Sequence, residues 1–308
     1  MNEPEESPIK EARTAGVVGL GIMGSAITAN LKAGGYRVLG FDIEQKALDS
    51  FEALGGELVS SPGAVVAEAP ITILSLPSSE ALHSVTAGDN GIAKLGRPGQ
   101  IVAECSTLSI NDKEAARDRL ADADIVLLDC PLSGTGAQAV NRDLAVYASG
   151  DQEAFERCRE LFTTFARSQH YVGPFGAGMR MKLVANLLVA IHNVASAEAM
   201  VLGMRAGLDP EQLYNVIRDG AGTSRMFEMR ALMMAEGAYE PAAMKLDVWQ
   251  KDMAMIAAFA EELGSPVPTF DATGPVYDAA LAEGFGNQDT AAVCAILQGL
   301  KNGGPKGS

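Results

Sequence analysis

Six residues near the start of the chain have the types and spacing that bind a pyrophosphate. Residues 16–18 form an apolar stretch, three glycines in a G-x-G-x-x-G pattern follow it, and a helical pattern begins directly afterwards. In such a motif the first glycine permits a tight turn, the second lets a phosphate approach the backbone, and the third lets helix and strand pack closely. The N–H groups at the start of the helix then bind the anion. We predict a dinucleotide-binding turn formed by Gly19, Leu20, Gly21, Ile22, Met23 and Gly24.

An acidic residue ends the next apolar stretch. Asp42 follows the glycines by about 20 residues, where an acid accepts hydrogen bonds from the adenosine ribose. Its neighbours Ile43 and Glu44 include no arginine, and a carboxylate repels a 2′-phosphate. This combination favours NAD over NADP. Asp is also a good N-cap for a helix that begins near Glu44, and the two roles are compatible.

Lys182 and Asn186 lie one helical turn apart in an otherwise apolar stretch that a glycine-rich segment precedes. A lysine and an asparagine at this spacing usually belong to a solvated helix face. A neutral lysine amine, however, can accept the proton of an alcohol while hydride leaves for a nicotinamide, and the ammonium can return it to a carbonyl oxygen. The apolar setting and the dinucleotide turn together predict that Lys182 is the catalytic acid–base group.

The elements that must position these residues change character midway along the chain. Between residues 15 and 172, short apolar stretches alternate with helical patterns, which is typical of a parallel sheet covered by helices. A long helix rich in Ala, Met and Leu is expected at 179–206, with further helices after Pro210, near 248–263 and near 290–300. We predict an α/β protein in which an N-terminal Rossmann-type, doubly wound parallel sheet (14–173) precedes an all-α C-terminal domain built on the long helix (174–308). Residues 1–13 and 301–308 are expected to be flexible tails.

Charge and composition exclude several classes of protein. Against 39 Asp and Glu there are 24 Lys and Arg, and the net charge of −15 has the wrong sign for binding a nucleic-acid backbone. The four cysteines have no CxxC spacing and the three histidines no HExxH spacing, so we expect neither a metal site nor disulfides. We find neither the apolar core of a secretory signal nor an uninterrupted apolar run of about 18 residues. We therefore expect a cytoplasmic protein that binds neither nucleic acid nor membrane.

Further motifs resemble those of the β-hydroxyacid dehydrogenase family, which belongs to the 6-phosphogluconate dehydrogenase superfamily and includes 3-hydroxyisobutyrate dehydrogenase, tartronate semialdehyde reductase and threonate-type dehydrogenases. The matches follow the family's order from about residue 16 to about residue 300. Beyond the glycine turn they comprise Leu76-Pro77, Ser106-Thr107, the loop from Asp129 to Thr135, the glycine-to-lysine-to-asparagine stretch from Gly176 to Asn186, and Lys251-Asp252.

This resemblance implies a role for each segment. Coenzyme binding is implied for Leu76, Pro77, Thr107 and Lys251, and substrate binding for Ser133, Gly134, Thr135, Lys182 and Asn186. The hydroxyl of Ser133 and the N–H groups of Gly134 and Thr135 would cradle a substrate carboxylate, although an ordinary Pro-Ser-Gly turn also explains these residues. Lys251 is a candidate for the cation that favours a neutral Lys182. Thr135 and the segment 141–143 depart from the glycines usual in the family, and these departures bear on the substrate.

The resemblance implies an NAD-dependent oxidoreductase, with NADP less favoured as the coenzyme. Such an enzyme moves a hydride between nicotinamide and the CH–OH or C=O group of its substrate. The substrate would be a small carboxylate-bearing hydroxy acid or semialdehyde. It also implies a homo-oligomer, either a dimer or a tetramer. Candidate substrates are 3-hydroxyisobutyrate, tartronate semialdehyde, 4-hydroxybutyrate and threonate. Two alternatives remain open. An imine reductase shares this plan but uses NADPH and usually lacks the lysine, and a non-catalytic NAD-binding protein would be expected to lack the lysine or the substrate loop.

Overall fold

The computed structural model describes residues 13–299, which divide into two compact units between Lys182 and Leu183. This division falls later in the chain than the predicted boundary at 173/174, because helix α9 (Ala177–Arg205) contributes residues to both units. The predicted tails at residues 1–12 and 301–308 lie outside the described residues. Arg13 is described, and its carbonyl accepts a hydrogen bond from the N–H of Arg37.

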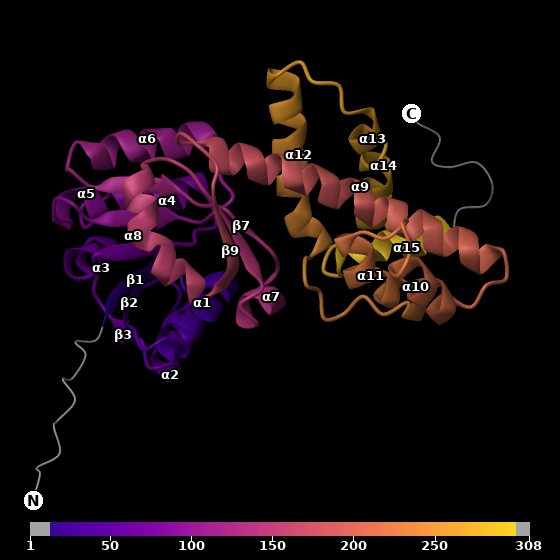
Figure 1. Ribbon diagram of the computed structural model, residues 1–308, viewed down its shortest axis with the longest axis horizontal. Helices are drawn as coiled ribbons and strands as arrows, with labels where there is room; N and C mark the ends of the chain where they lie inside the picture. The colour runs from indigo at the N-terminus through magenta and orange to yellow at the C-terminus, as the bar shows by residue number, and fades with distance from the viewer. Residues whose placement is uncertain (1–12, 300–308) are drawn as a thin grey trace, which may run out of the picture. The chain divides into compact units, whose positions relative to one another are not determined.

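A parallel sheet of six strands forms the centre of the first unit (Figure 1). The strand order is β3-β2-β1-β4-β5-β6, so the chain reverses its direction of travel across the sheet at β1. Such a reversal leaves a crevice at the carboxyl ends of the strands, where dinucleotides bind. The strands are β1 (Thr14–Val18), β2 (Arg37–Phe41), β3 (Glu57–Leu58), β4 (Ile71–Leu74), β5 (Ile101–Glu104) and β6 (Val126–Asp129).

Helices cover both faces of this sheet, because successive strand residues point to opposite faces and both sets are apolar. Val17 packs in one apolar cluster with α1, α2 and α8, whereas Val18 packs in the other with α3, α4, α5 and α6. The helices are α1 (Ile22–Ala33), α2 (Gln45–Ala53), α3 (Pro62–Glu68), α4 (Ser79–Ala87), α5 (Ile92–Leu95), α6 (Ile110–Ala121) and α8 (Gln152–Thr163). The predicted doubly wound fold is confirmed.

A second, three-stranded sheet completes the first unit and was not anticipated from the sequence. Its central strand β8 (Leu144–Ala148) pairs antiparallel with β7 (Leu132–Ser133) and parallel with β9 (Ala166–Tyr171). The short helix α7 (Gly136–Val140) follows β7 and packs against α1, which begins at the glycine turn. The predicted substrate loop therefore lies between β6 and a helix that contacts α1.

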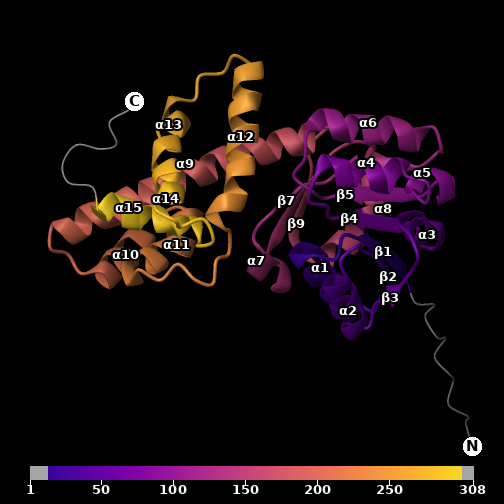
Figure 2. The ribbon, with the colours of Figure 1, turned by 180° about the vertical axis from the view of Figure 1, so that it is seen from behind.

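The second unit consists of helices in the residues that the structure describes (Figure 2). Apart from its share of α9, these are α10 (Pro210–Arg218), α11 (Arg225–Glu236), α12 (Leu246–Glu262), α13 (Pro268–Asp271), α14 (Gly274–Ala282), the 3-10 helix η1 (Thr290–Ala292) and α15 (Val293–Gly299). The prediction of an all-α second domain is confirmed, with one difference. The helix expected at 290–300 begins as a 3-10 turn, because the Asp289 carboxylate accepts the N–H of Ala291.

Helix α9 is the long helix that the sequence predicted. By length and composition it would also suit a membrane span, although 44% of its most apolar window is buried inside the structure. The central helix of a soluble helical domain has the same properties, and this one carries the buried polar side chains of Lys182, Asn186 and Asn193. Its length and apolarity therefore do not by themselves indicate a membrane protein.

Candidate coenzyme and proton-transfer site

Two glycines of the turn after β1 stand where no side chain fits. Gly19 has a φ of +88°, and a Cβ built there would lie 2.1 Å from the carbonyl oxygen of Ser75. A Cβ at Gly24 would lie 1.9 Å from the carbonyl oxygen of Gly19. Both glycines are therefore needed to bring α1 against the end of β1.

Gly21 stands where a Cβ would meet no atom within 4 Å. It is the N-cap residue of α1 and, having no side chain, gives the helix no side-chain cap. The N–H groups at the start of a helix attract anions, most strongly when no side chain of the protein caps them. This part of the turn fits a pyrophosphate group that approaches the backbone.

The Asp42 carboxylate connects this turn to the start of α2. Its Oδ2 accepts a 2.6 Å hydrogen bond from the N–H of Leu20, while its Oδ1 accepts from the N–H groups of Ile43 and Glu44 at 2.7 and 2.9 Å. A carboxylate offers about four lone-pair sites, so one remains for a ribose hydroxyl. Asp42 therefore supports the loop before α2 and is not the N-cap residue of that helix, which is Glu44. The free acceptor site fits the predicted ribose contact.

The segments predicted to bind the coenzyme after β4 and β5 are joined to each other. The Ser106 hydroxyl oxygen accepts a 2.7 Å hydrogen bond from the N–H of Leu76, and the N–H of Ser106 donates to Glu104 Oε1 at 2.9 Å. Pro77 and Thr107 directly follow these bonded residues in their loops. Both loops lie at the carboxyl edge of the sheet, as does the glycine turn, because all six strands are parallel.

Three fully buried charged side chains lie behind these loops. The Lys113 ammonium of α6 is 2.6 Å from Glu104 Oε2 and 2.8 Å from Asp129 Oδ1. Burial alone would lower the pKa of Lys113, but the two carboxylates outweigh burial and raise it above its ordinary value. Lys113 is therefore a permanent cation that holds the ends of β5 and β6 together.

The start of α9 is anchored at the same edge of the sheet. Asp129 Oδ2 accepts a 2.8 Å hydrogen bond from the N–H of Met179, and the Ser149 hydroxyl oxygen accepts a 2.9 Å bond from the N–H of Gly178. A Cβ at Gly178 would lie 2.4 Å from the carbonyl oxygen of Tyr147, so only glycine permits this approach. Lys182 follows one turn later and is 8% exposed.

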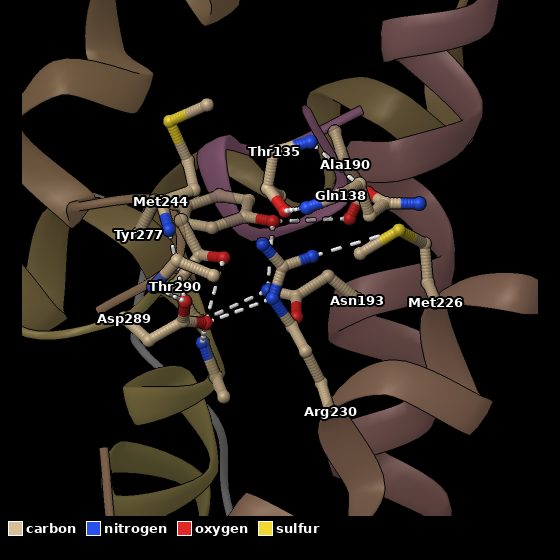
Figure 3. Close-up of polar contacts among 12 residues, drawn as sticks. Thr135, Gln138, Ala190, Asn193, Met226, Arg230, Met244, Tyr277, Asp289 and Thr290 are labelled. Carbon is tan, nitrogen blue, oxygen red and sulfur yellow. Dashed lines mark hydrogen bonds and ion pairs between the residues drawn. The ribbon is translucent and has the colours of Figure 1, made fainter. Parts of the chain in front are cut away.

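The predicted substrate loop has a different hydrogen-bond pattern from the one expected. The N–H of Thr135 donates to Gln138 Oε1 at 3.0 Å, and the Thr135 hydroxyl accepts from the N–H of Gln138, forming a capping box for α7 (Figure 3). Thr135 has ordinary extended backbone angles, which explains why a threonine is accepted where the family usually has glycine. The N–H of Thr135 is therefore engaged within the loop, and the predicted anion cradle depends on Ser133 and Gly134.

In the second unit, the asparagine of the Gly176–Asn186 stretch meets the late Lys-Asp pair. Asn186, 4% exposed, donates from Nδ2 to Asp252 Oδ2 at 2.9 Å, which links α9 to α12. Lys251 precedes Asp252 in α12 and is exposed. The structure therefore brings together two segments that the sequence separates by 66 positions.

Asn193 lies two turns beyond Asn186 but belongs to a buried network of the second unit (Figure 3). Its Nδ2 donates to the Tyr277 hydroxyl at 3.0 Å and to the carbonyl of Thr290 at 2.9 Å. Burial raises the pKa of Tyr277 to about 12, so its hydroxyl stays neutral and donates to the carbonyl of Ala190. Asn193 is engaged in holding α14 and η1 against α9.

The residues that the sequence argument overlooked are the buried partners of the site. Glu104, Lys113 and Ser149 were not among the predicted site residues, and Asp129 was noted only as part of a motif. One signal was available, because Lys113 is spaced with Ala116 and Leu120 on the buried face of α6. A lysine at such a position requires carboxylate partners.

A Rossmann unit with this glycine turn, followed by a helical unit, is the architecture of an NAD(P)-binding oxidoreductase. Two family models match the chain. The model described as the NAD binding domain of 6-phosphogluconate dehydrogenase covers residues 14–173, and the one described as NAD-binding of NADP-dependent 3-hydroxyisobutyrate dehydrogenase covers residues 176–297. The chain belongs to the β-hydroxyacid dehydrogenase family of NAD(P)-dependent oxidoreductases.

Individual relatives match over almost their whole length. The chain is 32% identical over 291 residues to an L-threonate dehydrogenase of Cupriavidus necator, covering 94% of this chain and 98% of that enzyme. It is 29% identical to an NAD-dependent L-serine dehydrogenase of Pseudomonas aeruginosa, covering 90% and 95%. Among solved structures, 3-hydroxyisobutyrate dehydrogenase of Mycobacterium tuberculosis with L-serine has a TM-score of 0.83 at 26% identity, covering 94% and 100%.

Proposed function

We propose that this chain is an NAD-dependent dehydrogenase of a small, polar, carboxylate-bearing hydroxy acid, with Lys182 as the group that transfers the proton. One observation carries the proposal. The first turn of the helix that bears Lys182 is hydrogen-bonded to Asp129 at the end of β6. This end of β6 lies at the same edge of the parallel sheet as the glycine turn and the loops after β4 and β5. The buried Lys182 and the glycine turn thus belong to the same unit, and the start of α9 is anchored at the edge of the sheet where the glycine turn lies.

The bound nicotinamide would supply the hydride chemistry, accepting hydride from the substrate carbon on oxidation and returning it on reduction. The chain's own residues fix where this happens. The N–H groups at the start of α1 would hold the pyrophosphate, and Asp42 would accept from the adenosine ribose and repel a 2′-phosphate. Leu76, Pro77 and Thr107 would line the coenzyme further along the sheet edge.

Lys182 moves the proton at the substrate oxygen. During oxidation its neutral Nζ accepts the hydroxyl proton as the carbonyl forms, and during reduction its ammonium donates that proton back to the oxygen. Asn186 lies one turn further along the same helix and would bind the same oxygen or hold the amine in place. The retention of this lysine favours a hydroxy acid over an imine substrate and a catalytic over a non-catalytic protein.

The substrate's carboxylate would be bound by the Ser133 hydroxyl and the N–H of Gly134, in the loop that follows β6. The relatives support a small polar acid, since the named enzymes act on L-threonate and on L-serine. We propose a substrate of this kind, with a hydroxyl at C3 or nearby. A four-carbon sugar acid such as threonate is the first compound to test.

The experiment is a turnover assay with NAD and NADP against a panel of hydroxy acids, each paired with its amide. We expect at least one acid of the panel to reduce NAD. The kcat/KM of its amide should be about 10- to 150-fold lower than that of the acid, because a charge-assisted hydrogen bond contributes about 1.5–3 kcal/mol. Equal efficiency for acid and amide would remove the carboxylate site from the proposal. Turnover of cyclic imines with NADPH alone would favour an imine reductase, and coenzyme binding without any turnover would favour a non-catalytic protein.

The proposal extends to a soluble, cytoplasmic homo-oligomer. Val184, Leu188 and Leu202 are large apolar side chains of α9 that are exposed within the second unit. A second copy of the chain that covered them would remove this apolar surface from water. Sedimentation equilibrium is expected to give a dimer or tetramer, and a monomer at micromolar concentration would contradict the proposal.

A further inference from the structure

A continuous line of polar contacts, buried except at its partly buried first member, runs from the loops predicted to bind the coenzyme to the helix that carries Lys182. It starts at the N–H of Leu76, passes through Ser106 to Glu104, crosses the Lys113 ammonium to Asp129, and ends on the N–H of Met179. Every contact between the partners along it lies between 2.6 and 2.9 Å. All its members belong to the first unit.

The start of α9 has no cap of its own. The residues that open it are Gly176, Ala177 and Gly178, whose side chains have no hydrogen-bonding atoms. Asp129 and Ser149, from other elements, accept the N–H groups of Met179 and Gly178 instead. The direction of the first turn of α9 is therefore set by a carboxylate that is itself held by Lys113.

The helix compensates part of the charge of this line. Glu104, Lys113 and Asp129 are each 0% exposed and together carry one excess negative charge. The positive end of the α9 dipole, equivalent to about half an elementary charge, lies at Asp129 and offsets part of that charge. The two carboxylates bind different segments. Glu104 accepts the N–H of Ser106 in the loop after β5, and Asp129 accepts the N–H of Met179 in α9.

Stability alone is a weak explanation for such a cluster. Replacing a buried ion cluster by apolar residues of similar volume is often neutral or stabilising, because desolvation offsets the attraction between the charges. What the charges provide is a fixed geometry, since each atom of the cluster is held by directed hydrogen bonds.

We propose that Asp129, which Lys113 holds in place, is a positioning residue that fixes Lys182 relative to the coenzyme loops. The inference rests on the proposed function in one respect, namely that Lys182 transfers the proton. A displacement of about 1 Å at a reacting group lowers the rate by as much as 100-fold, so loss of the Asp129 contact should reduce kcat while coenzyme binding persists.

Two double variants with equal charge test this. The first is Glu104→Gln/Lys113→Met and the second is Lys113→Met/Asp129→Asn. Both remove the ammonium and keep one buried carboxylate. Both also place one neutral amide next to the apolar side chain at position 113. Only the first retains the carboxylate on the N–H of Met179, whereas in the second a neutral amide oxygen, which is a weaker acceptor, takes its place. We expect kcat of the second to fall at least about tenfold below that of the first, with the NADH affinities of the two variants within about threefold of each other.

Hydrogen exchange at the first turn of α9 gives a readout that does not depend on turnover. Faster exchange there is expected for Lys113→Met/Asp129→Asn and not for its partner variant. If the second variant does not fold, Ser149→Ala is the substitute. It removes the acceptor of the Gly178 N–H and the hydroxyl that donates to Asp129, and it should show the same pattern at smaller size. Arg119→Met, at an exposed position of α6, is the control for changes on that helix.

The two ways of failing are distinct. Equal kcat and equal exchange in the two double variants would overturn the positioning proposal. A Lys182→Met variant that keeps its turnover would overturn the proposed function, whatever the double variants show. Faster exchange with unchanged kcat in Lys113→Met/Asp129→Asn would show an anchored helix that does not serve catalysis, which also overturns the positioning proposal.

Discussion

Asn186 Nδ2 donates a 2.9 Å hydrogen bond to Asp252 Oδ2, which joins α9 to α12. Each helix carries a lysine close to this bond in sequence: Lys182 lies one turn before Asn186, and Lys251 directly precedes Asp252. The contact engages the nitrogen end of the amide. The carbonyl oxygen is then the atom through which Asn186 would accept a bond from an ammonium or a substrate hydroxyl. The proposed role of Asn186 thus depends on Asp252, which fixes the orientation of the amide.

The first prediction concerns Lys182. Lys182→Ala should lower kcat at least about 100-fold, because general acid–base catalysis contributes about 10²- to 10⁴-fold, while NADH affinity should change only a few-fold. Lys182→Arg should fail as well, since a guanidinium does not release its proton in the working pH range. For alcohol oxidation by the wild type, the rate should rise with pH because the neutral amine is the base. Steady-state kinetics and NADH fluorescence titration measure these effects.

Arg180→Ala is the control, because it changes an exposed cation on the same turn of α9. It should leave kcat within about twofold, as surface substitutions usually have small effects. A Lys182→Ala variant that retains a tenth of wild-type kcat, with a deuterium isotope effect showing that chemistry limits the rate, would assign the proton transfer to another residue.

The second prediction separates two glycines of the coenzyme turn. A Cβ at Gly21 meets no atom, so Gly21→Ala should unfold at the wild-type temperature but bind NADH at least about tenfold more weakly, because the methyl group occupies the space of the pyrophosphate. A Cβ at Gly24 lies 1.9 Å from the carbonyl oxygen of Gly19, so Gly24→Ala should lower the unfolding temperature even without coenzyme. Thermal unfolding with and without NADH distinguishes the two. Equal NADH affinity in Gly21→Ala and wild type would place the pyrophosphate elsewhere.

The third prediction concerns coenzyme choice. Asp42→Ala should lower the ratio of kcat/KM for NAD to that for NADP by at least about tenfold, because the carboxylate no longer repels the 2′-phosphate. Asp42→Asn should lower it less, since one oxygen still accepts from the N–H of Leu20. Both variants lose part of the support for the loop before α2, so some loss with NAD is also expected. A ratio that rises in Asp42→Ala would show that Asp42 does not bind the ribose.

The Rossmann unit could be predicted because its signals are local. The glycine turn, the acid after the second strand and the alternation of apolar stretches each arise within about 20 to 30 residues. Helix α9 was equally clear, since its Ala- and Met-rich stretch contains no proline and only one glycine, Gly203, before Gly207. The three-stranded sheet was harder, because β7 has only two residues and takes its identity from pairing with β8.

The supports of the site could not be predicted, because they depend on contacts that only the fold creates. Asp129 and Met179 are 50 positions apart, and Glu104 meets Lys113 only when β5 and α6 pack together. The expected cradle at Thr135 missed a local alternative, since Gln138 stands three residues later and completes a capping box. Asn193 shares a helix face with Asn186 by periodicity, yet its partners come from α14 and η1.

The second unit has a buried ion pair of its own, which yields the last prediction. Arg230 Nε lies 2.8 Å from Asp289 Oδ1, and Asp289 Oδ2 accepts the N–H groups of Ala243 and Met244 (Figure 3). Burial alone would raise the pKa of Asp289, but the Arg230 guanidinium and the N–H groups of Ala291 and Met244 lower it below its ordinary value. The pair fixes the loop before α12 against α11 and η1.

Arg230→Met should lower the free energy of unfolding of this unit by about 3–5 kcal/mol at pH 7, because it leaves the Asp289 carboxylate buried without its cation. Urea unfolding followed by fluorescence measures it, since Trp249 is the protein's only tryptophan and is buried in α12. Arg218→Met, which removes an exposed guanidinium of the same unit, is the control and should change little.

The pH dependence of the same measurement follows from the lowered pKa of Asp289. An Asp whose pKa is lower in the folded than in the unfolded state contributes stability that is fully present above the unfolded value, near 3.9, and is lost as the pH falls through the folded value. The unfolding free energy should therefore decrease as the pH falls from about 5 toward 3, and Asp289→Asn should reduce that slope. An Asp289→Asn variant with the wild-type slope would show that other carboxylates cause the acid destabilisation of this unit.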